Sequence, residues 1–133
     1  MMRWVAKTFG RLPAYANTAI VLALVLYLTL VPKPLPDDTP HLFAGADKVV
    51  HGLMFWAVAT AWMFDAYRRH HLLNLSRIFI ITATSIAFGG AIEVAQYLMA
   101  MGRGAEWVDF LADIIGAIAA GLTSPYFVRW LLD

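Results

Sequence analysis

The sequence predicts an all-α fold: a polytopic membrane protein built as a four-transmembrane-helix bundle with a polar cluster at the outer leaflet. The first observation is composition, because apolar residues make up 61% of the 133 residues and charged residues only 14%, against about half and about a quarter in soluble domains. The second is the presence of four long apolar stretches. The third is that the few polar residues within these stretches recur at helical spacing. The length suits a single domain over residues 1–133.

Charge and residue types exclude several classes of function. The formal net charge is +1 and no basic patch with interleaved aromatic residues appears, so we expect no nucleic-acid partner. The chain has no cysteine, which excludes disulfides, thiolate catalysis and cysteine-bound metals. The partner that the composition indicates is the lipid bilayer.

The first helix is expected over residues 15–31, an apolar run that follows Arg3, Lys7 and Arg11. A basic start before a short apolar core also occurs in signal peptides, but no small-x-small cleavage pattern follows the run. We therefore interpret it as an uncleaved span. The next segment, residues 32–46, is rich in proline, which prevents a helix and predicts an external loop.

The other three spans are expected over residues 49–67, 78–101 and 108–131. Asp47 lies at the start of the first of these, where a carboxylate suits the positive end of the helix dipole. Small residues recur at every fourth position from Ala83 to Ala95 and from Ala112 to Ala120. Such stripes allow two helices to approach closely, so we expect both stripes at helix contacts.

Lysine and arginine predict the orientation, because cytoplasmic loops carry them in excess. Four spans place both termini and the middle loop on one side, with seven of these residues: Arg3, Lys7, Arg11, Arg68, Arg69, Arg77 and Arg129. The opposite side has three: Lys33, Lys48 and Arg103. We therefore expect a multi-pass protein of the cell (plasma or inner) membrane with both termini in the cytoplasm.

This orientation brings the polar residues of the spans into one leaflet. Glu93 and Gln96 are three positions apart, and Asp109 and Asp113 are four apart, so each pair shares a helix face. At ~1.5 Å rise per residue, Glu93 lies ~12 Å below the outer end of its helix. We expect one outward-facing polar site formed by Asp47, Lys48, His51, Glu93, Gln96, Arg103, Asp109 and Asp113.

At these positions the chain resembles the VanZ-like family of small membrane proteins. The motifs that carry the resemblance are Asp47-Lys48-x-x-His51 with Phe55, Glu93-x-x-Gln96, the turn Gly102-Arg103, and Asp109-x-x-x-Asp113 followed by Gly116-Ala117. They cover roughly residues 47–121. The family usually has asparagine where this chain has Asp113, and proline where it has Met101. The family takes its name from a protein linked to low-level resistance to the glycopeptide teicoplanin, so the resemblance implies a cell-envelope location and a link to antibiotic resistance.

Three functions fit the polar site. In the first, it binds an envelope lipid head group or a cell-wall precursor, with Lys48 and Arg103 on phosphate and the acids on hydroxyls or an amine. In the second, it is a hydrolase or transferase in which Asp47 orients His51 as general base and Glu93 is the acid. In the third, the polar residues pair with one another and act as a structural staple that locks the helices together. The sequence decides between none of them.

The charge of the site bears on its cofactors. With every acid ionised and His51 neutral, four carboxylates and two basic side chains leave an excess of two negative charges. Protonation of an acid or binding of a cation relieves such an excess in a low dielectric. A divalent metal on His51, Glu93 and either Asp109 or Asp113 is a variant of the enzyme hypothesis, although no motif requires a cofactor.

Overall fold

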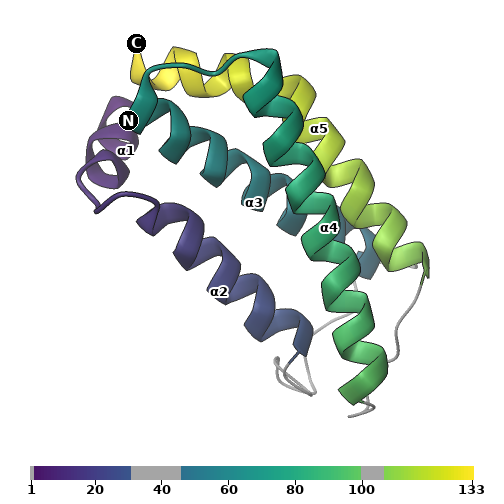
Figure 1. Cartoon of the computed structure of the whole chain (residues 1–133). Coiled ribbons are helices and arrows are strands. Elements are labelled where there is room, and N and C mark those ends of the chain that lie inside the picture. The colour runs from purple at the N-terminus through teal and green to yellow at the C-terminus, as the bar shows by residue number, and fades with distance from the viewer. Residues whose placement is uncertain (1, 31–45, 100–106) are drawn as a thin grey trace.

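The structure is a computed structural model that describes residues 2–30, 46–99 and 107–133. It contains five helices: α1 (Met2–Gly10), α2 (Ala16–Leu30), α3 (Ala46–His70), α4 (Leu75–Met99) and α5 (Trp107–Leu132). The expected all-α class is confirmed in the described part of the chain, and α2 to α5 correspond to the four expected spans. Both termini lie at one end of the molecule (Figure 1), which we call the terminal end; the opposite end is the site end.

Three helices, α3, α4 and α5, are long and apolar enough to cross a membrane. They make the chain a small helical membrane protein, with large apolar side chains exposed on its outside. Leu53, Phe79 and Leu122, for example, are more than half exposed, as expected of side chains that contact lipid. The first expected span, which corresponds to α2, is an apolar helix of 15 residues, shorter than the roughly 20 residues of a typical span.

The centre of the bundle is a close crossing of α3 and α5. Gly52 and Gly116 meet there, and a Cβ atom built on Gly116 would collide with the carbonyl oxygen of Gly52. Ala120 is fully buried one turn further along α5. The predicted contact stripe from Ala112 to Ala120 is therefore confirmed, because a larger side chain at position 116 would force the two backbones apart.

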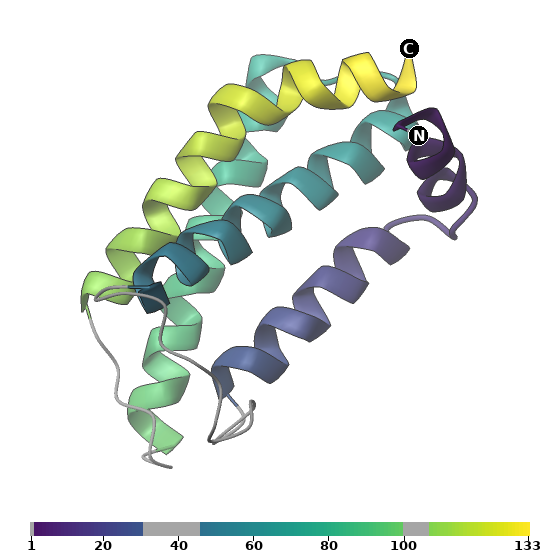
Figure 2. The ribbon, with the colours of Figure 1, turned by 180° about the vertical axis from the view of Figure 1, so that it is seen from behind.

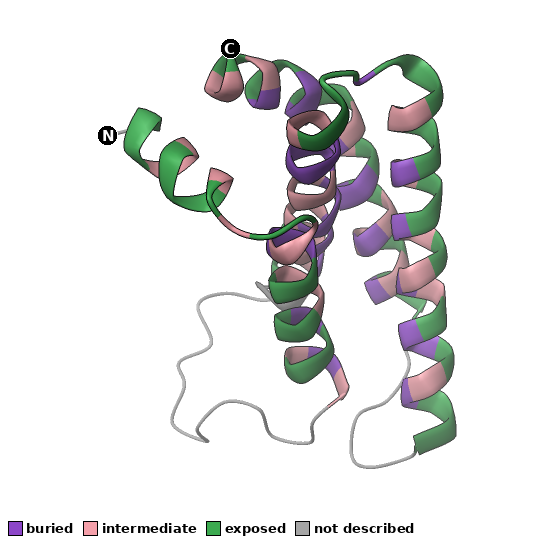
Figure 3. Ribbon diagram, turned by 60° about the vertical axis from the view of Figure 1, so that its left-hand side comes forward, coloured by how far each residue is buried: buried purple, intermediate pink, exposed green. Residues whose placement is uncertain are grey.

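The predicted stripe from Ala83 to Ala95 is wrong. Ala83, Ala87 and Ala91 are exposed and Ala95 is half-buried, and Figure 3 shows α4 with an exposed outer face and buried residues on its inner side. The buried row contains Ser85, Gly89 and Glu93.

Both rows have four-residue spacing, but they are offset by two residues, which is about 200° around a helix with 3.6 residues per turn. They therefore occupy nearly opposite faces of α4. The row with Glu93 turns inward because a carboxylate that faces lipid is more costly than an alanine that does so.

The polar contacts at the terminal end join α1 and α2 to α3. The Asp65 carboxylate accepts hydrogen bonds from Asn17 Nδ2 (2.8 Å) and from the backbone N–H of Thr18 (2.8 Å). It therefore satisfies free N–H groups in the first turn of α2. One turn along α3, the Arg68 guanidinium donates to the carbonyl oxygens of Phe9 and Leu12, each at 2.5 Å. One face of α3 thus caps both preceding segments.

Two further features shape the bundle. α1 lies across the terminal end beside the ends of α3 and α5, as the view from behind shows (Figure 2). α5 continues through Pro125 to Leu132 and bends in its last part (Figure 1), as expected where proline lacks the N–H that would bond to the carbonyl four residues earlier. The sequence analysis did not predict α1.

Candidate functional site

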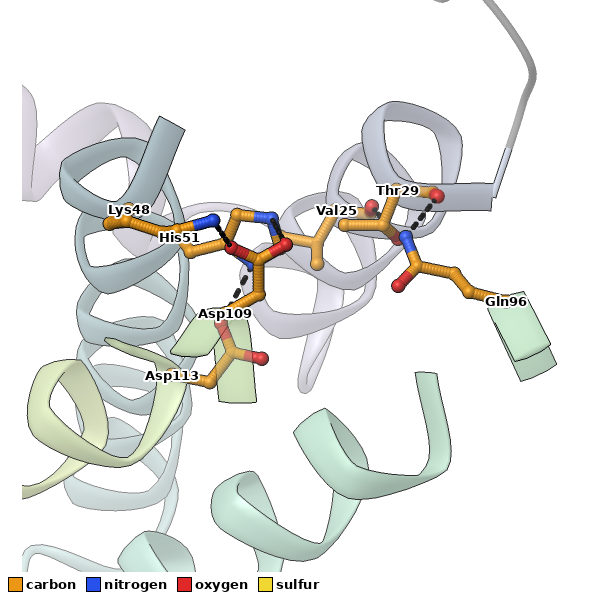
Figure 4. Close-up of polar contacts among 7 residues, drawn as sticks. All are labelled: Val25, Thr29, Lys48, His51, Gln96, Asp109 and Asp113. Atoms are coloured by element: carbon orange, nitrogen blue, oxygen red, sulfur yellow. Dashed lines mark hydrogen bonds and ion pairs between the residues drawn. The ribbon is translucent and has the colours of Figure 1, made fainter. Parts of the chain in front are cut away.

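The polar side chains of α3 and α5 meet at the site end (Figure 4). Lys48 Nζ lies 2.5 Å from Asp109 Oδ1, and His51 Nδ1 lies 3.0 Å from Asp113 Oδ1. These contacts place two residues from the start of α3 against two from the start of α5. Lys48 and His51 are close to one helical turn apart, as are Asp109 and Asp113, so each pair shares a helix face.

His51 is held from both sides of its imidazole ring. Asp113, which is fully buried, bonds to Nδ1, while Nε2 lies 3.7 Å from Asp109 Oδ2. An ionised Asp113 accepts a hydrogen bond from the Nδ1–H group of His51. The other ring nitrogen, Nε2, then has a lone pair, which is directed toward Asp109. Metal-binding and catalytic histidines commonly have this arrangement. A carboxylate bonded to one ring nitrogen fixes the orientation of the ring, and with it the direction of the other nitrogen.

Glu93 of α4 completes a group of three ligand-bearing side chains. One ligand atom each from His51, Glu93 and Asp109 lies within 4.8 Å of the others. Three atoms at this separation surround a position that a single metal ion could occupy, because metal–ligand distances are about 2.0–2.6 Å. We call these three residues the triad. Its members come from three different helices.

The surroundings of the triad combine a hydrophobic floor with a polar rim. Phe55, one turn below His51, is fully buried. A Cβ atom on Gly89 would lie 3.1 Å from Asp113 Oδ2 and 3.2 Å from the Phe55 ring, so the absence of a side chain at Gly89 allows α4 to approach. His51 is 6% exposed and the Lys48 side chain 28%. The site therefore opens toward the end of the bundle where Lys48 lies.

Gln96 belongs to a different contact. Its side-chain N–H donates to the carbonyl oxygen of Thr29 at 2.7 Å, which ties α4 to the last turn of α2. In Figure 4 its amide group meets Thr29 of α2. Glu93 and Gln96 are both buried, as expected of residues that share a helix face. The hydrogen bond described for Gln96, however, goes to the backbone of α2.

Two of the expected site residues cannot be placed. The α3 helix begins at Ala46, so Asp47 lies in its first turn, but the Asp47 side chain lies outside the described part of the structure, as does the whole of Arg103. The role expected for Asp47, to orient His51, stays a prediction, and in the described part of the site Asp113 bonds to His51 Nδ1. The structure thus brings together Lys48, His51, Glu93, Asp109 and Asp113.

The sequence analysis missed the partners that α2 supplies. Asn17 and Thr18 bind Asp65, and Thr29 receives Gln96. Asn17 and Thr18 are buried polar residues of an otherwise apolar helix, and that was the available signal, because polar groups in apolar surroundings require partners. Thr29 accepts through its backbone carbonyl, which no side-chain pattern indicates. Asp65 lies one turn from Arg68 along α3, but its described hydrogen bonds go to α2.

Comparison with family models, with curated proteins and with solved structures finds no match for this chain.

Proposed function

We propose that the protein binds a divalent cation at the triad and, through it, the phosphate-bearing head group of an envelope lipid or a cell-wall precursor. The observation that carries the proposal is the convergence of His51, Glu93 and Asp109 ligand atoms within 4.8 Å, with His51 oriented by Asp113 from the opposite ring nitrogen. A histidine whose other nitrogen is bonded to a carboxylate is the usual form of a metal ligand.

Charge supports a cation. The site residues expected from the sequence carry four carboxylates and two basic side chains, so two negative charges remain when every acid is ionised and His51 is neutral. Such an excess is costly at a site shielded from water, and a divalent cation cancels it. Imidazole and carboxylate ligands suit Mn²⁺ and Zn²⁺ among common protein metals.

The head group follows from the position of the site. Three protein ligands leave at least one coordination position for an oxygen atom of a bound molecule. The Lys48 ammonium group lies beside Asp109 at the more exposed rim of the site, where it would form a charge-assisted hydrogen bond with phosphate. The site lies near the ends of the long apolar helices, the depth at which lipid head groups are found.

Metal titration tests the cation. The purified protein, stripped of metal with a chelator, is titrated with Mn²⁺ or Zn²⁺ while its melting temperature and bound metal are measured. The parent should bind one ion and melt at a higher temperature, since a ligand that binds only the native state stabilises it. His51→Gln should lose this binding, whereas His71→Gln, an exposed control at the terminal end, should retain it. Equal binding by both variants would contradict the proposal.

Native mass spectrometry with membrane lipids retained tests the head group. The parent should co-purify with a phosphate-bearing lipid that a chelator releases, and His51→Gln should lack it. A lipid retained equally by His51→Gln would exclude binding through the triad. The staple interpretation predicts neither metal nor lipid.

A second candidate function is a membrane hydrolase or transferase on the same class of lipid. The contact of 3.0 Å between His51 Nδ1 and Asp113 Oδ1 favours it, because a carboxylate that orients a histidine prepares the other nitrogen to accept a proton. Glu93 would then be the acid. Incubation with an envelope lipid extract should yield a product by mass spectrometry with the parent and none with His51→Gln.

The family and the orientation are also proposals. The resemblance to VanZ-like proteins is supported by the meeting of three of its motif positions, His51, Asp109 and Asp113. Membership predicts that expression in a susceptible host raises the minimum inhibitory concentration of teicoplanin, and that His51→Gln abolishes the increase. The proposed orientation, with the site end outward and the termini in the cytoplasm, rests on the excess of basic residues at the terminal end.

A further inference from the structure

The terminal end has a basic groove that the proposed function does not use. Two cavities adjoin one another where α1 lies against the ends of α3 and α5, and Lys7 and Leu132 line both. Their volumes are about 430 and 370 Å³, within the range of small-molecule sites. We call the two cavities together the terminal groove.

The two halves of the terminal groove differ in chemistry. The smaller cavity is strongly basic, with Lys7, Arg11, Arg68 and His71 among its lining residues. The larger one has more apolar residues in its lining, and these are Met2, Ala6, Trp130, Leu131 and Leu132, beside Arg3, Lys7 and Asp133. A molecule that fills both needs an anionic part joined to an apolar part.

The basic groups of the groove are not equally available. The Arg68 guanidinium is used by the carbonyl oxygens of Phe9, Leu12 and Pro13, so it contributes charge but few free donors. Lys7 and Arg11 are exposed, and neither forms an ion pair with any residue of the described segments. These two side chains are therefore the available phosphate-binding groups.

Acidic groups at the groove are few. The Asp133 side chain lines the larger cavity, and its carboxylate accepts a hydrogen bond from the Tyr67 hydroxyl at 2.7 Å. The smaller cavity has no carboxylate among its described lining residues. The positive charge of Lys7, Arg11 and Arg68 therefore faces no described carboxylate in the smaller cavity.

The groove also lies at a suitable depth. α1 is short and amphipathic, with no buried residue, and it lies beside the points where α3 and α5 end. Trp4 and Trp130 are 68% and 64% exposed, and such rings anchor at the boundary between head groups and acyl chains. A helix of this kind lies in the plane of the interface, which brings the groove level with lipid phosphates.

We infer that the terminal groove binds an anionic phospholipid. The phosphate of the head group lies on Lys7 and Arg11, and the apolar part of the lipid lies against Met2 and Leu131. Basic pockets between membrane helices commonly bind such head groups. This site is at the opposite end from the triad, and it does not depend on the cation or on the function proposed there.

The test counts bound lipid by native mass spectrometry. The purified protein in a neutral detergent is titrated with phosphatidylglycerol and, separately, with phosphatidylcholine. The parent should bind phosphatidylglycerol at least tenfold more tightly. Lys7→Gln combined with Arg11→Gln should weaken that binding roughly 30-fold, because each basic residue near an anionic lipid contributes about fivefold in affinity.

Matched variants distinguish lipid binding at the terminal groove from general electrostatic attraction to the basic end of the protein. Arg69→Gln combined with Arg77→Gln removes the same charge at the same end but touches neither cavity, so it should weaken binding less than threefold. Lys7→Arg combined with Arg11→Lys keeps the charge and should keep the preference, which excludes a folding defect. Equal losses in the two glutamine doubles, or no preference for phosphatidylglycerol, would overturn the inference. Inorganic phosphate that displaces the lipid at equal concentration would assign the groove to soluble phosphates and also overturn it.

Discussion

At the scale of single residues, the pairing of His51 with Asp113 determines what the site can do. Asp113 is fully buried and bonds to Nδ1 of the imidazole ring, whereas Asp109 lies near Nε2. In the proposed cation site, Asp113 would therefore act through His51. Such carboxylates fix the ring and raise the basicity of the ligating nitrogen.

Asp113→Asn tests this positioning role. The asparagine keeps the size of the side chain but not its charge, so the protein should fold while its affinity for Mn²⁺ or Zn²⁺ falls 10–100-fold. Bound metal and melting temperature are measured together. Asp133→Asn, which removes an exposed carboxylate at the terminal end, should leave metal affinity unchanged. A loss of folding without a loss of metal affinity per folded molecule would indicate a structural role alone.

At the scale of helices, the crossing of α3 and α5 depends on one glycine more than on the other. The Cβ of an alanine at position 116 would collide with the Gly52 carbonyl, whereas one at position 52 would lie 3.5 Å from the carbonyl oxygen of Ala112, an ordinary contact. The two positions therefore differ in the room that they leave for a side chain, although they meet at the same crossing.

Gly116→Ala should therefore destabilise the protein by about 3 kcal/mol, as overpacking does. Gly52→Ala should be close to neutral, because the added methyl group has room. Chemical unfolding in a mild detergent compares the two variants with the parent. Equal losses of stability would mean that the crossing is not as close as the structure has it.

The attachment of α2 to α3 is a second property of the helices. Asp65 is 1% exposed and caps the first turn of α2 from another helix, while Asn74 caps α4 locally by accepting the Arg77 N–H at 2.9 Å. The first contact joins two helices, and the second acts within one.

Asp65→Ala should cost about 3 kcal/mol, since it removes hydrogen bonds to a charged group and leaves buried donors unpaired. Asn74→Ala should cost about 1 kcal/mol, as loss of a local cap does. Amide hydrogen exchange should show faster exchange in α2 only for Asp65→Ala. Unchanged protection of α2 in that variant would exclude the Asp65 contact as its anchor.

For the molecule as a whole, α4 determines the distance between the site end and the terminal end. Its 25 residues, Leu75–Met99, span about 36 Å at the usual rise, which exceeds the ~30 Å hydrocarbon core. The chain has no cysteine, so a single introduced cysteine reports one position without background.

Met99→Cys should react with an impermeant thiol reagent on intact cells, and Asn74→Cys should react only after the membrane is opened. The basic residues at the terminal end favour this orientation. The reverse labelling would invert the proposed orientation. Labelling of both positions on intact cells would show that α4 does not separate two sides of a membrane.

The sequence by itself determined the helical class, the approximate ranges of α2 to α5 and the helix faces on which polar residues lie together. These properties depend on neighbours within about one turn, and local apolar runs and three- or four-residue spacing report them directly. The same spacing predicts His51, Glu93, Asp109 and Asp113 as site candidates. It did not find α1, whose nine residues are too few for periodicity to stand out.

Which helix faces meet follows from contacts between residues far apart in the sequence. Asp113 orients His51 from 62 positions away, and Asp65 caps α2 from 47 positions away. Two rows of four-residue spacing compete on α4, and the row with Ser85, Gly89 and Glu93 turns inward. There Gly89 packs against Asp113 of α5 and Phe55 of α3, and Glu93 approaches His51 and Asp109. No local pattern contains that information, since burial of a row depends on what the other helices present to it.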